Sequence, residues 1–73
     1  MYKIYSKDGC VHCERAKELL EYRDIPYKEI KLGVDVDIDT FKEDNPSVRS
    51  MPYILFDEEV IGGYNELSKR LLG

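Results

Sequence analysis

The chain has two cysteines, Cys10 and Cys13, and they stand three positions apart. They follow a short apolar segment and a Lys7-Asp8-Gly9 turn, and they begin a segment whose residues are typical of a helix. A helix start presents unpaired N–H groups and the positive end of the helix dipole, which both favour a thiolate over a thiol. Because the thiolate attacks in disulfide exchange, this spacing in this context predicts a redox-active pair.

The helical register separates the two sulfur atoms. Cys13, Ala16 and Leu20 stand at i, i+3 and i+7, so Cys13 lies on the apolar stripe that a helix buries. Cys10 lies at the helix cap, where solvent should reach it, and such surroundings lower a cysteine pKa from about 8.5 to roughly 3.5–7.5. We therefore expect Cys10 to attack and Cys13 to resolve.

Three other uses of this pair are alternatives to redox chemistry. A structural disulfide would close a very small loop in a chain without other cysteines. A metal site could use Cys10, His12 and Cys13, but adjacent helical residues point apart and the chain has no second Cys/His pair. Two unrelated core cysteines stay as an alternative.

Length, composition and net charge indicate a small single-domain protein and argue against secreted, membrane-anchored and nucleic-acid-binding proteins. A length of 73 residues predicts one domain, spanning 1–73, with a small core. The N-terminus leads directly into a strand, and no apolar run approaches the ~20 residues that span a bilayer, so we expect neither a signal peptide nor a membrane anchor. Two cysteines in so short a chain fit a reducing cytoplasm. The net charge of −4 argues against nucleic acid as the main partner.

The elements that position the cysteines form a β-α-β unit. Tyr2–Ser6 and residues 27–32 have the composition of strands. The helix between them should end near Arg23 and Asp24, because Ile25 precedes a proline and is pushed towards an extended conformation. The order predicts parallel strands joined by a right-handed crossover.

The segment after the second strand is ambiguous, because three apolar residues alternate in it with three aspartates. This alternation mimics an edge strand and also the start of a calcium loop. The calcium alternative fails, since Thr40 holds the glycine position and Pro46 that of the bidentate glutamate. We favour a short helix over about Ile38–Asp44, capped by Asp37 and with Ile38 and Phe41 inward. An edge strand stays as the alternative.

The last third of the chain predicts a hairpin and a helix. Residues 52–56 form a buried strand, and residues 59–61 return as a short antiparallel partner. Two glycines then lead into a helix over Tyr64–Leu72, on which Glu66 and Arg70 are spaced for an i,i+4 ion pair. The whole order is β-α-β-α-β-β-α.

Three motifs occur in a specific order and spacing: residues 5–20 around the cysteines, Ser50-Met51-Pro52, and the Gly-Gly run in residues 61–67. Together they resemble the glutaredoxins, a branch of the thioredoxin fold, over nearly the whole chain. The resemblance implies an α/β, thioredoxin-like fold with a four-stranded mixed sheet in the order 2-1-3-4, its last strand antiparallel, and three helices. It also implies a cis Pro52. The compact chain and Val11 are similar to virus-encoded members.

The resemblance also implies a glutathione site. Lys7 would hold the glycine carboxylate of glutathione, with Arg49 as a second candidate. Met51, before the cis Pro52, would pair its backbone with the cysteinyl unit. An ordinary surface lysine is the alternative for Lys7.

The γ-glutamyl end of glutathione would lie at the start of the last helix. The resemblance implies that Gly63 lets the γ-glutamyl unit approach the backbone and that the N–H groups of Tyr64 and Asn65 bind its carboxylate. A glycine turn that enters a helix is a ready anion site, which agrees with this assignment. A plain strand-to-helix turn is the alternative.

The function implied is that of a glutathione-disulfide oxidoreductase. Cys10 would attack a protein disulfide or a protein–glutathione mixed disulfide, Cys13 would resolve, and glutathione, the co-substrate, would reset the dithiol. We expect a cytoplasmic monomer without a metal. One alternative is a glutaredoxin-like electron donor to ribonucleotide reductase, recharged by thioredoxin reductase. Another is an iron–sulfur cluster-binding glutaredoxin, although cluster carriers usually have serine at the Cys13 position.

His12 departs from the family's Cys-Pro-Tyr-Cys pattern. It could serve only as a ring beside glutathione, in place of the usual tyrosine. It could instead tune the redox potential, because a partly protonated imidazole would stabilise the Cys10 thiolate and make the disulfide more oxidising.

Overall fold

Four strands form one mixed sheet in the order β2-β1-β3-β4 in the computed structural model, which describes residues 1–73. β1 pairs with β2 in parallel and with β3 antiparallel, and β4 returns antiparallel to β3. The elements follow the predicted β-α-β-α-β-β-α order: β1 (Tyr2–Ser6), α1 (Val11–Tyr22), β2 (Tyr27–Lys31), α2 (Ile38–Asp44), β3 (Tyr53–Phe56), β4 (Glu59–Gly62) and α3 (Tyr64–Leu72). None of the three helices combines the length and apolar character needed to cross a membrane.

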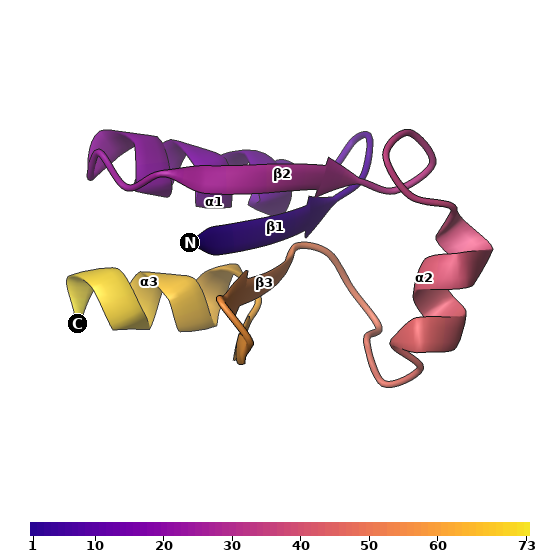
Figure 1. Cartoon of the computed structure of the whole chain (residues 1–73). Helices are drawn as coiled ribbons and strands as arrows, with labels where there is room; N and C mark the ends of the chain where they lie inside the picture. The colour runs from indigo at the N-terminus through magenta and orange to yellow at the C-terminus, as the bar shows by residue number, and fades with distance from the viewer.

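The core lies on one face of the sheet. In β1 the side chains of Tyr2, Ile4 and Ser6 are buried, whereas those of the alternating residues are exposed or half-buried. Strand geometry explains this, because successive side chains point to opposite faces. The core cluster draws on β1, β3, α1 and α3, and its members are Tyr2, Ile4, Ala16, Leu20, Ile54 and Leu67. α1 and α3 therefore cover the same face, and α1 runs alongside β1 and β2 (Figure 1).

α1 begins and ends where the sequence predicts. Cys10 is its N-cap and Arg23 its C-cap. Asp24 then takes a left-handed conformation with φ of 55°, which turns the chain out of the helix. The buried stripe of α1 consists of Cys13, Ala16 and Leu20, as its register requires.

α2 stands apart from the other helices, beyond the ends of β1 and β2 (Figure 1). Aromatic packing holds it there: the Phe41 ring centroid lies 4.8 Å from that of Tyr5 and 6.1 Å from that of Tyr53. The Asp37 side chain caps the helix by accepting the backbone N–H of Thr40 at 3.1 Å. The helix and its cap are thus confirmed, and the edge-strand alternative is wrong.

One side chain of α2 is not where the sequence analysis placed it. Phe41 is buried as predicted, but Ile38 remains 43% exposed. A helix of seven residues at the rim of the sheet directs one large side chain into the aromatic contact. Ile38 lies instead over the loop at Gly33, where a Cβ would be 3.6 Å from the Ile38 side chain.

Three connecting segments meet at the end of the sheet where α2 stands, and both chain termini lie at the opposite end (Figure 1). The β1–α1 turn is held by an ion pair of 2.7 Å between Asp8 and Lys31. The loop before β3 contains a cis Met51–Pro52 peptide bond, which confirms the expectation that came with the family resemblance. This end of the molecule therefore carries the cysteine motif and the proline loop together.

The predicted ion pair between Glu66 and Arg70 on α3 does not form. Arg70 donates from Nε to the Tyr2 hydroxyl at 3.1 Å and lies 3.4 Å from the Glu59 carboxylate. Glu66 accepts the backbone N–H of Gly63 at 2.7 Å. An exposed i,i+4 pair contributes only about 0.3–0.5 kcal/mol, so tertiary and capping partners displace it easily.

Candidate active site

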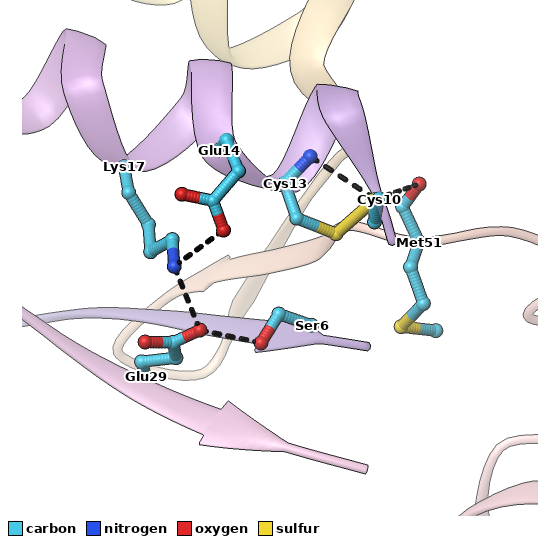
Figure 2. Close-up of a disulfide and its surroundings, with 7 residues drawn as sticks. All are labelled: Ser6, Cys10, Cys13, Glu14, Lys17, Glu29 and Met51. Carbon is cyan, nitrogen blue, oxygen red and sulfur yellow. Dashed lines mark hydrogen bonds and ion pairs between the residues drawn. A yellow bond between two sulfur atoms is a disulfide. The ribbon is translucent and has the colours of Figure 1, made fainter. Parts of the chain in front are cut away.

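A disulfide joins Cys10 and Cys13 at the start of α1, with the two Cα atoms 5.2 Å apart. The Cys10 sulfur also caps the helix, because it accepts the backbone N–H of Cys13 at 3.1 Å (Figure 2). Cys10 is half-buried and Cys13 is fully buried. The predicted difference in exposure is confirmed, and it makes Cys10 the sulfur that a second molecule can reach.

The proline loop lies directly against this disulfide. The Cys10 sulfur is 3.6 Å from the carbonyl oxygen of Met51, although the two residues are 41 positions apart in the chain (Figure 2). A backbone segment so close to the sulfur can pair with the chain of an incoming disulfide, as an added strand does. Cys10 and Met51 thus form one reactive corner.

A polar network lies beside the buried cysteine, on the turn of α1 that follows it (Figure 2). The Glu29 carboxylate accepts the hydroxyl of buried Ser6 at 2.7 Å and the ammonium of Lys17 at 3.1 Å. These two donors, Ser6 first, hold the pKa of Glu29 below its ordinary value. Lys17 also pairs with Glu14 at 2.9 Å, and that bond raises the pKa of Lys17. The network ties α1 to β1 and β2 beneath the disulfide.

The lowered pKa of Glu29 predicts a loss of stability in acid. A carboxylate whose folded pKa lies below its unfolded value of about 4.3 stabilises the fold above that pH, and this contribution is lost as the pH falls through the folded pKa. Between about pH 6 and about pH 3, wild type should lose about 1 kcal/mol more unfolding free energy than Glu29→Gln, allowing for partial exposure. Urea unfolding followed by circular dichroism measures this.

The matched control for that measurement is Glu43→Gln, which removes an exposed α2 carboxylate that has no hydrogen bond or ion pair in the structure. It should keep the wild-type pH profile. If Glu29→Gln shows the same loss in acid as wild type, then the network does not stabilise the fold through the charge of Glu29.

A cavity of about 190 Å³ opens beside the reactive corner. The rings of His12 and Tyr64 lie on its wall with centroids 6.2 Å apart and planes inclined by 26°. Six of the residues predicted from the sequence gather here, together with two others: the lining consists of His12, Ser50, Met51, Pro52, Gly63, Tyr64, Asn65 and Glu66. The tertiary structure thus joins the cysteine motif, the proline loop and the start of α3.

Lys7 and Arg49 do not line this cavity. They lie in a neighbouring groove of about 240 Å³, which shares Ser50 and Met51 with the cavity. The Ser50–Met51 segment therefore lies between Lys7 and the cavity, whereas Arg49 also lines a third groove of about 390 Å³ together with Gly63 and Glu66. A ligand that used all the predicted residues would have to cross this segment.

The sequence analysis did not assign Ser50, Glu66 or Lys42 to the site, although each lines the cavity or the groove. For Glu66 a signal existed. A glutamate three residues after a helix N-cap often accepts the backbone N–H of the cap, and Glu66 does so at Gly63. No group of three or more His, Cys, Asp or Glu residues is arranged to hold a metal ion.

Comparison with known proteins gives consistent matches. The family model described as Glutaredoxin matches residues 3–61. Glutaredoxin 1 of Rickettsia bellii is 34% identical over 68 residues, which cover 88% of this chain and 69% of the relative. Glutaredoxin 3 of Escherichia coli K12 is 32% identical over 69 residues, which cover 89% of this chain and 78% of the relative.

The fold matches solved structures as well. The crystal structure of Glutaredoxin 1 from Francisella tularensis, in complex with cacodylate, is similar to this chain with a TM-score of 0.80 and 27% sequence identity. The match covers 96% of this chain and 90% of that one. The fold is thioredoxin-like, with the predicted sheet order 2-1-3-4 and three helices.

Proposed function

The chain belongs to the glutaredoxin family, whose members are oxidoreductases, and on this premise we propose that it is a glutathione-dependent thiol–disulfide oxidoreductase. Its substrates are protein disulfides and mixed disulfides between proteins and glutathione. The Cys10/Cys13 pair is its dithiol, and glutathione is its co-substrate. Residues 1–73 act as a single glutaredoxin domain.

The observation that carries this proposal is the cavity next to the disulfide. One wall is the proline loop, whose Met51 carbonyl lies 3.6 Å from the Cys10 sulfur. Another part of the lining is the start of α3, where backbone N–H groups and the helix dipole favour a carboxylate. In the proposal, Met51 pairs with the cysteinyl unit of glutathione, and the N–H groups of Tyr64 and Asn65 take the γ-glutamyl carboxylate.

The cations of the neighbouring groove complete this proposed site. Lys7, and Arg49 as a second candidate, would hold the glycine carboxylate of a glutathione that reaches across Ser50 and Met51. Both side chains are exposed and neither forms an ion pair in the structure. Each is therefore free to bind an anion.

The reaction follows from the position of the two sulfurs. The Cys10 thiolate attacks one sulfur of the substrate disulfide, that S–S bond breaks, and the leaving thiolate takes a proton. With a protein disulfide, Cys13 then attacks the Cys10 sulfur, which releases the second substrate thiol and forms the Cys10–Cys13 disulfide. Two glutathione molecules return the pair to the dithiol and leave as glutathione disulfide. Sulfur exchange transfers the two electrons without a metal.

The proposed setting is a reducing cytoplasm, with the protein as a monomer. Two alternative functions would use the same sulfur atoms. One differs in the reductant that returns the disulfide to the dithiol, and the other in binding an iron–sulfur cluster. An electron donor to ribonucleotide reductase would be recharged by thioredoxin reductase rather than by glutathione. An iron–sulfur cluster carrier would be brown after anaerobic purification.

One kinetic experiment tests the glutathione site. Gly63 has φ of −102°, which other residues adopt, and a Cβ there would lie 3.3 Å from Glu66 Oε1 and 3.7 Å from the Pro52 oxygen. Gly63→Val should therefore fold but crowd the cavity. We expect its KM for glutathione to rise roughly tenfold, as the loss of one well-placed contact predicts, with little change in Cys10 alkylation. The assay is the reduction of a small mixed disulfide by glutathione.

Gly63→Ala is the graded control, and its smaller side chain should raise the KM less. Thioredoxin reductase with NADPH replaces glutathione in a parallel assay. Reset by the reductase and not by glutathione, or an unchanged glutathione KM in Gly63→Val, would overturn the proposal in favour of the reductase-dependent donor.

A further inference from the structure

The groove that holds Lys7 and Arg49 is larger and more basic than a single carboxylate requires. Its volume is about 240 Å³, against about 190 Å³ for the cavity beside His12. The side chain of Phe41, 4% exposed, lies at its base, and Ile38 and Val48 add apolar walls. Three cations surround it: Lys7, Lys42 and Arg49. We call it the basic groove.

The charges of the basic groove contrast with those of the chain. The protein carries 15 acidic and 11 basic residues, yet no acidic residue lines this groove. The ion pairs of the structure use Lys17, Lys31, Arg70 and the N-terminal amine, so all three groove cations are unpaired. They are also exposed. An acidic protein thus presents three cations without ion-pair partners around one groove.

The helix α2 produces this separation of charge by its register. Ile38, Phe41 and Lys42 stand at i, i+3 and i+4, so they share the face that lines the groove. The acidic residues of α2 and its cap do not line it. The arrangement therefore places Lys42 alone, among the charged residues of α2, towards the groove.

The basic groove adjoins the cavity at the proline loop. Ser50 and Met51 line both, and the Met51 carbonyl is 3.6 Å from the Cys10 sulfur. A polypeptide whose cysteine reaches Cys10 can thus continue into the groove while glutathione occupies the cavity. The glycine carboxylate of glutathione would neutralise Lys7 or Arg49 and leave the other two cations unpaired.

We propose that the basic groove binds an acidic polypeptide segment next to the reacting cysteine of the protein substrate. This inference rests on the proposed function, which it deepens by naming the substrate class: disulfides flanked by glutamate or aspartate. The apolar base at Phe41 accommodates the segment, and Lys7, Lys42 and Arg49 supply charge complementarity. Such complementarity acts on the rate of encounter and on specificity more than on affinity.

The test uses the reduced full-length protein and three synthetic peptides, each with one cysteine as a mixed disulfide with thiopyridine. The cysteine is flanked by glutamates, by serines or by lysines. The Cys10 thiolate attacks the peptide sulfur, the bond to thiopyridine breaks, and 2-thiopyridone leaves with a proton. Cys13 then displaces the peptide thiol and forms the Cys10–Cys13 disulfide. Absorbance of the thiopyridone gives a second-order rate constant for each peptide without glutathione.

Which peptide reacts faster shows whether the net charge of the protein or the charge of the basic groove governs the reaction. The net charge of −4 would favour the lysine peptide, whereas the basic groove favours the glutamate peptide. We expect the glutamate peptide to react roughly tenfold faster than the lysine peptide at low ionic strength. This ratio should shrink at 1 M salt, where the screening length falls to about 3 Å.

Lys42→Glu is the decisive variant, because Lys42 is outside the residues assigned to glutathione. It should lower the glutamate-to-lysine ratio by roughly fivefold, the effect of about 1 kcal/mol at an exposed charge. Lys28→Glu is the matched control, since Lys28 is exposed on β2 without an ion pair, and it should keep the wild-type ratio. The glutathione KM should not change in Lys28→Glu.

Equal ratios in Lys42→Glu and wild type, or equal losses in Lys42→Glu and Lys28→Glu, would overturn the proposal. A raised glutathione KM in Lys42→Glu with an unchanged peptide ratio would assign the groove to glutathione alone and overturn it too. A glutamate preference in a protein that glutathione does not reset would support the groove and overturn only the proposed function. No thiopyridone release from any peptide would overturn both.

Discussion

Replacing Cys10 by serine is expected to reduce thiol–disulfide exchange to the uncatalysed rate, whereas Cys13→Ser should keep activity on glutathione mixed disulfides. The reason is access. Cys10 is half-buried and caps α1, so its sulfur can be reached and accepts the Cys13 N–H, while Cys13 is fully buried. Cys13→Ser should lose the reduction of protein disulfides that needs a resolving thiol. Initial rates with a glutathione mixed disulfide and with a protein disulfide separate the two reactions.

Alkylation gives an independent measurement of the same assignment. In the reduced protein at mildly acidic pH, iodoacetamide should label Cys10 first, because only the thiolate reacts and only Cys10 meets solvent. Mass spectrometry of the labelled peptides identifies the site. Faster labelling of Cys13, or retained dithiol activity in Cys10→Ser, would reverse the roles of the two cysteines.

His12→Tyr should make the redox potential of the pair more negative by tens of millivolts. If an imidazolium at the first turn of α1 stabilises the Cys10 thiolate, it stabilises the reduced form and makes the disulfide more oxidising. Its removal then shifts the potential to a more negative value, and about 30 mV corresponds to a tenfold change in the exchange constant. Equilibration with glutathione buffers at about pH 7 measures the shift.

A ring-only role for His12 has structural support, because its ring lies near parallel to that of Tyr64 across the wall of the cavity. Tyrosine retains such a ring and removes the charge, so the substitution separates the two roles. The charge role requires the potential of His12→Tyr to be more negative than that of wild type. A constant potential, or a shift to a less negative value, leaves His12 as a ring beside the ligand.

Local sequence determined the elements and the two cysteine environments. The i, i+3, i+7 spacing of Cys13, Ala16 and Leu20 buries one sulfur, and the position of Cys10 before the first turn leaves the other at the cap. Asp37 likewise marked the start of α2. These features depend on neighbours within one or two turns of the same element, and such short-range interactions are written in consecutive residues.

The family resemblance supplied what local physics could not. About 5–6% of X–Pro bonds in folded proteins are cis, so nothing in Ser50-Met51-Pro52 by itself favours that isomer. The likeness of this motif to a known one did, and the structure has the cis bond. The sheet order 2-1-3-4 came from the resemblance in the same way, since the pairing of strands that are far apart in the sequence is not a local property.

Only the tertiary structure decided which predicted residues share a site. It brought Met51 to the Cys10 sulfur and the start of α3 to His12, but it placed Lys7 and Arg49 in a separate groove with Lys42. These residues are far apart in the sequence and meet only because α2 and the loops pack together at one end of the sheet. No single segment of the sequence determines that packing.

Charge partners were the other feature that the sequence left open. Arg70 lies one turn from Glu66 but binds Tyr2 and Glu59, and Glu66 caps Gly63. The free energies of exposed ion pairs differ by only a few tenths of a kcal/mol. The groups that the tertiary structure brings close to each charge therefore decide which pairs form. The sequence of this protein therefore determined where its sulfurs lie along one helix, and the assembly of the sheet decided what surrounds them.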